Sequence, residues 1–176
     1  MAPVSRLRGR AWRQTAIRVP GCLPPEQPAP HAGRYHGAGD PWPLYAALER
    51  ETMWAEWAHA TDAPRRPADD PRWVCELEVD LTVLDLREPA TRRALRVGLP
   101  GLTGPWSPDA PNRDARRVAR AAAELGVDGA IVPSAAAEGG WNLVVLPRAF
   151  ERVRMRRRRR ETAPASAVRP STDGRG

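Results

Sequence analysis

The chain has 176 residues, a length that suits one folded domain with short irregular ends. Its net charge of +7 equals the charge of the arginines within residues 152–160, so the rest of the chain sums to zero. Lysine is absent, which excludes Schiff-base chemistry, a lysine general base and a phosphate-binding loop that ends in lysine.

Cysteine, histidine and apolar content narrow the class of protein further. Cys22 and Cys75 lie far apart without CxxC spacing, so we expect neither a disulfide framework nor a zinc ribbon. The three histidines are scattered and predict no metal site. No apolar run reaches the roughly 18 residues of a membrane span, and residues 1–10 lack the apolar core of a signal peptide. The pattern predicts a protein of the reducing cytoplasm with no membrane contact.

Short strands are predicted on both sides of an irregular stretch in the first part of the chain. Residues 1–10 form a basic lead-in that we expect to be flexible. Residues 20–32 are rich in proline, which predicts a loop. The strands are expected at residues 12–19, 34–36 and 43–46.

A helix is predicted from about residue 48 to residue 60. Trp54 and Trp57 stand at helical spacing and are expected to be buried. Glu56 lies beside this stripe, on a face that it shares with His59. A buried aromatic flank can therefore anchor the helix while the carboxylate of Glu56 points into a cleft.

The middle of the chain alternates loops, strands and helices. The longest of these helices has one apolar face and one arginine-rich face, and Gly126 favours its end. In chain order we expect a loop at 62–71, a half-buried strand at 73–79, a short helix at 88–97, a turn-rich stretch at 99–111 and this longer helix at 112–125.

Two uniform apolar runs follow, at residues 130–132 and 143–146. Glycine and proline bound them, which predicts central strands covered on both faces. Ser134 comes after the first run, at a rim position that suits a site residue. The expected fold class is α+β, a single domain with a small mixed β-sheet flanked by helices. We expect the catalytic domain at residues 11–150 and a disordered, arginine-rich tail at 151–176.

Charged and aromatic side chains that could act together at one site occur on separate predicted elements. The guanidinium groups of Arg13 and Arg34 present donor forks that fit phosphate oxygens. Tyr35 and Tyr45, the two tyrosines of the chain, each offer a flat ring and a hydroxyl. Glu56 is the candidate carboxylate for a sugar whose anomeric carbon becomes oxocarbenium-like. Together these groups suit the binding of a dinucleotide and the cleavage of its glycosidic bond.

Five short motifs occur in a characteristic order: Ala11-Trp12-Arg13, Gly33-Arg34-Tyr35-His36, Leu44-Tyr45-Ala46, Ala55-Glu56 and Pro133-Ser134-Ala135. In this order they resemble the RES domain family, over a stretch from about residue 13 to residue 147. Members of that family include NAD+-degrading toxins of Xre–RES toxin–antitoxin pairs, with a fold similar to ADP-ribosyltransferases. The chain departs from the family at Tyr35, where many relatives have tryptophan, and in its arginine-rich segment.

The resemblance implies an NAD+-degrading enzyme, a phosphorylase or glycohydrolase that cleaves the nicotinamide–ribose bond. NAD+ is then the substrate, no cofactor is expected, and inorganic phosphate is the co-substrate of the phosphorylase reaction. The implied partner is a helix-turn-helix antitoxin of the Xre type. The implied substrate-binding residues are Arg13, Arg34, Tyr35 and His36, and the implied catalytic residues are Tyr45, Glu56 and Ser134.

Two other functions remain open from the sequence. An ADP-ribosyltransferase would use the same bond cleavage and pass ADP-ribose to a macromolecule. An inactive binding protein would use the arginines of residues 152–160 on nucleic acid or another anionic partner, in a weak, salt-sensitive and sequence-independent contact. The alternative for this segment is a solvated tail. Phosphate, water and a macromolecule all remain alternatives as the acceptor.

Overall fold

The computed structural model describes residues 2–60, 71–105, 107 and 112–164. The expected loop at 62–71 and the end of the tail lie almost wholly outside the described residues. The strands are β1 Ser5–Ala16, β2 Leu44–Ala47, β3 Arg72–Asp85, β4 Gly129–Pro133, β5 Trp141–Val145 and β6 Val153–Glu161. The helices are α1 Arg50–Ala60, α2 Pro89–Leu95, α3 Leu99–Thr103 and α4 Arg113–Glu124, with a 3-10 turn η2 at Pro147–Arg152.

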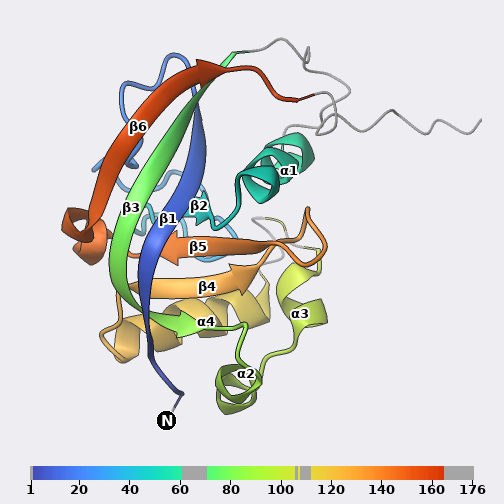
Figure 1. Ribbon diagram of the computed structural model, residues 1–176. Coiled ribbons are helices and arrows are strands. Elements are labelled where there is room, and N and C mark those ends of the chain that lie inside the picture. The colour runs from blue at the N-terminus through green and yellow to red at the C-terminus, as the bar shows by residue number, and fades with distance from the viewer. Residues whose placement is uncertain (1, 61–70, 106, 108–111, 165–176) are drawn as a thin grey trace, which may run out of the picture.

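Five of the strands close into a barrel (Figure 1). Around the barrel their order is β1-β2-β5-β4-β3, and β1 pairs with β3 along its whole length to complete the ring. β3 and β4 are parallel and the other pairs are antiparallel, so the sheet is mixed. The prediction of a single α+β domain with a mixed sheet is confirmed, and closure of that sheet into a barrel is an additional finding.

β1 begins well before the strand that was predicted at residues 12–19. The expectation of a flexible lead-in is wrong for residues 5–10, which form half of this strand. Arg6, Arg8 and Arg10 point outward there and pair with carboxylates of β3, while alternate residues face the barrel interior. In residues 5–10, the alternation of arginine with small and apolar residues is therefore typical of a β-strand.

β6 corrects the expectation of a disordered tail for residues 153–161. It pairs antiparallel with β3, beside the barrel. Arg158 anchors it, because the guanidinium donates hydrogen bonds of 2.8 Å to the carbonyl oxygens of Val19 and Pro20. The same guanidinium lies 4.3 Å from the ring centre of Trp73. Strand pairing satisfies the backbone of this arginine run while most of its side chains remain in solvent.

β4 and β5 run through the middle of the sheet and are covered on both faces, as predicted. Ile131 and Leu143 face the barrel interior, whereas Val132 and Val144 belong to the cluster packed under α4. A third cluster joins α1 to the barrel. The predicted helices at 88–97 and 112–125 are α2 and α4.

Two local expectations are wrong. Residues 34–36 form a bend instead of a strand, and the Gly33 amide donates a 3.0 Å hydrogen bond to the His36 carbonyl across it. The turn-rich stretch at 99–111 begins with the short helix α3. Pro100 occupies the first turn of that helix, where proline needs no hydrogen-bond acceptor.

The spacing of the cysteines suggested no disulfide framework, but Cys22 and Cys75 form a disulfide. Their Cα atoms lie 6.3 Å apart although 53 residues separate them in sequence. The bond ties the proline-rich loop after β1 to the start of β3. Sequence spacing did not predict it, since the proximity depends on how the barrel brings the loop over β3.

We expect reduction of this disulfide to lower the free energy of unfolding by about 4 kcal/mol, because the bond closes a segment of 53 residues in the unfolded chain. Thermal melts with and without dithiothreitol measure the change. A Cys22→Ala, Cys75→Ala variant should match the reduced protein and not respond to the reductant. An unchanged melting temperature of the reduced wild-type protein would contradict the expectation.

Candidate active site

Glu56 lies on α1 and is held by donors from two other elements. Ser134, after β4, donates a hydrogen bond from Oγ to Glu56 Oε1 at 2.6 Å. Asn142, on β5, donates from Nδ2 to the same oxygen at 2.6 Å. Glu56 Oε2 accepts no hydrogen bond from the described residues. The protein therefore fixes one carboxylate oxygen and leaves the other available to a ligand.

Ser134 acts on the carboxylate of Glu56. Its Oγ accepts hydrogen bonds from the backbone amides of Ala136 at 3.1 Å and Ala137 at 3.0 Å, so its single proton goes to Glu56. The residue is only 6% exposed. It is a positioning residue in this structure, and its implied contact with substrate stays a prediction.

Asn142 was not among the predicted site residues. It is the polar residue near the start of an otherwise apolar strand, opposite Val132 in the ladder between β4 and β5. A buried strand that carries one amide side chain indicates a specific partner for that amide, and Glu56 is that partner. The single asparagine in this apolar strand was the feature of the sequence that could have identified Asn142 as a site residue.

The direction of Glu56 is set by the packing of α1. Trp54 and Trp57 are almost fully buried and meet edge to face, with ring centres 5.8 Å apart. On the other side, a Cβ atom at Gly140 would lie 2.6 Å from Thr52 Oγ1, so the turn after Ser134 packs directly on the helix. The prediction that a buried aromatic flank anchors this helix is confirmed.

A cavity of 790 Å³ adjoins Glu56, a size within the range of small-molecule sites. It lies between α1, the segment after α3 and the ends of β4 and β5. Four predicted site residues line it together, namely Arg34, Tyr35, Tyr45 and Glu56. Asn142 contributes to the same wall.

Tyr35 is buried and Tyr45 is partly buried, and their ring centres lie 6.4 Å apart. The Tyr45 hydroxyl accepts a hydrogen bond of 3.3 Å from the Tyr35 amide, so its own proton is available to His36 Nδ1 at 2.9 Å. Burial raises the pKa of Tyr45 to about 12 and also raises the pKa of Tyr35. The Tyr35 hydroxyl is buried without a partner among the described residues.

His36 lies behind Tyr45 and does not line the 790 Å³ cavity. Burial lowers the pKa of His36, and nearby Arg116 lowers it further, while Asp40 opposes them. A neutral ring suits the hydrogen bond, because Nδ1 can then accept the Tyr45 proton. The structure thus gives His36 a positioning role, and its implied substrate contact stays a prediction.

We expect the lowered pKa of His36 to make the protein less stable in acid. The folded-state pKa lies below the unfolded value of about 6.5, so stability is complete above about pH 6.5 and falls as the pH drops toward the folded-state value. Melting temperatures between about pH 8 and about pH 5 test this. A His36→Asn variant should show a smaller decline, and an identical decline in both proteins would contradict the assignment.

The structure does not bring the two predicted arginines into one cavity. Arg34 donates from Nη1 to the carbonyl oxygens of Leu102 and Gly104, both at 2.8 Å, and holds the end of α3 against the larger cavity. Arg13 donates to the Tyr45 carbonyl at 2.9 Å and lines a second cavity of 320 Å³. Tyr45 and Glu56 line both cavities and stand between them.

Arg13 is a partly buried cation without a carboxylate partner among the described residues. Burial lowers its pKa to about 10, so it stays protonated at neutral pH. Its Nε has no hydrogen-bond partner in that part of the chain. An anion in the 320 Å³ cavity would meet this charge.

Acidic, cysteine and histidine side chains are dispersed over the described part of the chain, where no three of them are grouped so as to hold a metal ion. None of the helices in the described ranges is long and apolar enough to cross a membrane.

Comparison with known proteins identifies a family and a solved structure of similar fold. The model of the RES domain matches residues 3–166. The crystal structure of the M. tuberculosis MbcT-MbcA toxin-antitoxin complex contains a similar chain, with a TM-score of 0.74 and 23% identity over 91% of this chain and 87% of that one. Among curated proteins no relative matches the sequence. Since the family match covers both β1 and β6 and every residue of the site, the chain belongs to the RES domain family.

Proposed function

We propose that the protein cleaves the bond between nicotinamide and ribose in NAD+. The observation that carries this proposal is the state of Glu56, which lines a 790 Å³ cavity with one oxygen held by Ser134 and Asn142 and the other unbonded within the described chain. A fixed carboxylate stabilises positive charge that develops on a sugar ring. Membership of the RES domain family supports the same chemistry.

In the proposed complex, the dinucleotide occupies the larger cavity. Arg34 uses Nη1 on backbone carbonyls, and the rest of its guanidinium is the proposed contact for the pyrophosphate. The Tyr45 ring lies beside the nicotinamide riboside. The unpartnered hydroxyl of Tyr35 supplies a further hydrogen bond.

The reaction begins as the bond from ribose C1 to the nicotinamide nitrogen breaks. The electron pair of that bond goes to the nitrogen, and nicotinamide leaves as a neutral molecule. Glu56 stabilises the cationic ribose until an acceptor oxygen bonds to the same carbon and releases its proton. Inorganic phosphate gives ADP-ribose 1''-phosphate, and water gives ADP-ribose.

We favour phosphate as the acceptor. The 320 Å³ cavity also reaches Glu56, and Arg13, a cation without a carboxylate partner among the described residues, lines it. A water molecule can bind without a neighbouring cation, whereas the binding of a phosphate ion requires one. Hydrolysis and transfer to a macromolecule are the alternative outcomes.

We also propose that the protein is the toxin of a toxin–antitoxin pair in the cytoplasm, where NAD+ is abundant. The similar chain of known structure belongs to a toxin-antitoxin complex. The proposed partner is a helix-turn-helix antitoxin of the Xre type that covers the larger cavity. Co-expression with the reading frame that adjoins the gene tests this, since a true antitoxin should co-purify with the protein and restore growth.

Product analysis tests the proposed reaction. Purified protein is incubated with NAD+ labelled in the adenosine moiety, with and without inorganic phosphate, and the products are separated by chromatography. We expect ADP-ribose 1''-phosphate that depends on phosphate. Label on protein or nucleic acid would identify a transferase, and intact NAD+ under all conditions would favour the inactive binding protein.

A further inference from the structure

β1, β3 and β6 lie side by side, with β3 in the middle (Figure 1), and their outward side chains form a surface that we call the arginine face. Arginines occupy both outer strands, and carboxylates occupy the middle one. The members are Arg6, Arg8 and Arg10 of β1, Glu76, Glu78 and Asp80 of β3, and Arg154, Arg156, Arg157 and Arg159 of β6.

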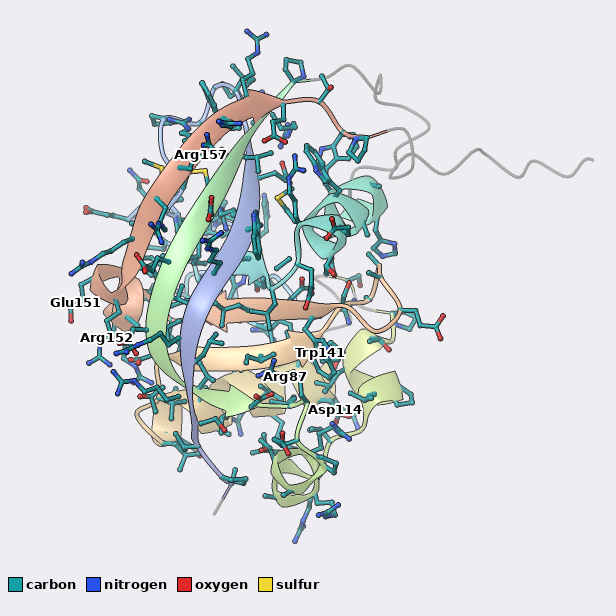
Figure 2. The ribbon with its side chains drawn as sticks, in the orientation of Figure 1. Arg87, Asp114, Trp141, Glu151, Arg152 and Arg157 are labelled. Atoms are coloured by element: carbon teal, nitrogen blue, oxygen red, sulfur yellow. A yellow bond between two sulfur atoms is a disulfide. The ribbon has the colours of Figure 1, made fainter. Side chains whose placement is uncertain are left out.

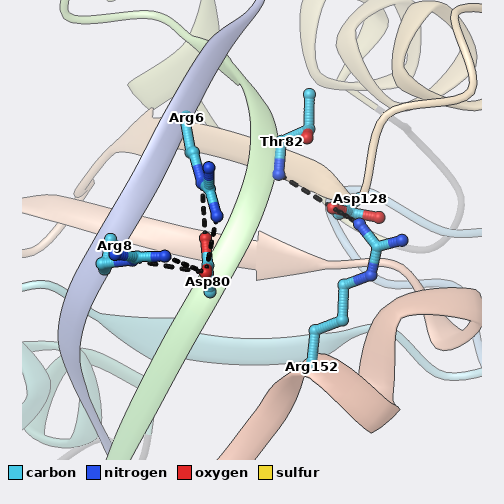
Figure 3. A network of polar contacts seen from close by, with 6 residues as sticks. All are labelled: Arg6, Arg8, Asp80, Thr82, Asp128 and Arg152. Atoms are coloured by element: carbon cyan, nitrogen blue, oxygen red, sulfur yellow. Dashed lines mark hydrogen bonds and ion pairs between the residues drawn. The ribbon is translucent and has the colours of Figure 1, made fainter.

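The carboxylates of the arginine face are already paired. Asp80 accepts hydrogen bonds from both Arg6 and Arg8 (Figure 3), and these guanidinium groups hold the pKa of its carboxyl well below the usual range. Glu76 pairs with Arg10 at 3.1 Å, and Glu78 lies 3.8 Å from Arg156. Seven arginines therefore meet three carboxylates, and the face remains strongly positive.

The uncompensated charge is concentrated on β6. Arg154, Arg157 and Arg159 are exposed and make no side-chain hydrogen bond or ion pair with the described residues; Arg157 is labelled in Figure 2. Arg158 is different, because its guanidinium is bound to backbone carbonyls and to Trp73. β6 thus carries one arginine that is bound within the fold and three that are available to a ligand.

A groove of 740 Å³ extends this face toward η2. Arg6 and Arg8 line it from β1, and Arg152 and Arg154 line it from the opposite side. The carboxylates of Glu78, Asp80 and Glu151 also line this groove. Figure 3 shows Arg152 paired with Asp128, which in turn accepts a hydrogen bond from the Thr82 amide. The basic surface is therefore concave at one end and braced by the fold.

We propose that the arginine face binds the phosphate backbone of a double-stranded nucleic acid without reading its bases. Side chains on one face of a strand recur about every 6.6–6.8 Å, twice the roughly 3.4 Å axial spacing of phosphates along one strand of a duplex. Single-stranded binding relies on exposed aromatic rings, whereas the arginine face contains none, and Trp12, which follows it on β1, packs against the cluster under α1.

Salt-dependent binding tests the proposal. Fluorescence anisotropy of a short labelled DNA duplex of mixed sequence is measured between about 50 and about 200 mM salt. The Arg157→Gln, Arg159→Gln variant should weaken binding about tenfold and reduce the slope of log affinity against log salt by about 2. The matched control is Arg93→Gln, Arg113→Gln, which removes the same charge from exposed sites on α2 and α4 and should bind like wild type.

Three results would overturn the proposal. Equal weakening by both variants would mean that net charge alone attracts the duplex. Binding of a polyglutamate peptide of matched charge as tightly as the duplex would identify an acidic protein partner. Absence of duplex binding at the lowest salt would exclude nucleic acid as the ligand of the arginine face. The NAD+ assay is independent of all three, since the arginine face shares no residue with the cavity over Glu56.

Discussion

Replacing Glu56 by glutamine is expected to lower kcat/KM for NAD+ by about 100- to 1,000-fold, the usual cost of losing one group that stabilises transition-state charge. Glutamine keeps a carbonyl oxygen that can accept the hydrogen bonds from Ser134 and Asn142. The geometry of the site is then conserved while the negative charge is lost. Initial rates of nicotinamide release and circular dichroism melts measure the two effects separately.

The alanine variant and a neighbouring glutamate provide controls. Glu56→Ala leaves the buried donors of Ser134 and Asn142 without an acceptor and should also lower stability by about 1–3 kcal/mol. Glu51 is exposed on the same helix, so Glu51→Gln should change neither quantity. Activity of Glu56→Gln within a few-fold of wild type would show that the residue is structural and that the chemistry lies elsewhere.

The largest effect on stability is expected for Trp57→Ala, which should lower the free energy of unfolding by about 3–5 kcal/mol. Trp57 is 1% exposed, and its ring packs edge to face on Trp54. Its removal leaves a cavity between α1 and the barrel that the surrounding strands cannot fill. Urea denaturation measures the loss.

Trp57→Phe is the matched variant, because it keeps an aromatic ring at the contact with Trp54. Its loss of stability should be clearly smaller than that of Trp57→Ala. Since α1 carries Glu56, the alanine variant should also lose NAD+ cleavage at temperatures where it is still folded. A stability loss below about 1 kcal/mol for Trp57→Ala would mean that the α1 cluster does not anchor the helix.

The elements that were predicted well depend on local patterns. The apolar faces of residues 112–125 and the uniform runs at 130–132 and 143–146 report burial directly, and the structure places them as α4, β4 and β5. Barrel closure depends on the pairing of β1 with β3, whose residues are far apart in sequence. β6 was missed because a run of arginines predicts a solvated segment, whereas backbone pairing with β3 orders it.

The site shows the same division between local and long-range information. The motif resemblance identified Arg34, Tyr35, Tyr45 and Glu56, which the structure places around one cavity. Asn142 was missed, since one amide in a strand has no spacing pattern that names its partner. The assignment of Arg13 and Arg34 to separate cavities likewise needed the fold, because Tyr45 and Glu56 stand between those cavities.

Nicotinamide release from NAD+ is the most direct test of the account. Purified wild-type protein and Glu56→Gln are incubated with NAD+ in the presence of phosphate, and free nicotinamide is measured by chromatography. The account predicts release by the wild-type protein and a loss of about 100-fold or more in the variant. Equal release by both proteins, or none by wild type after removal of any bound antitoxin, would contradict it.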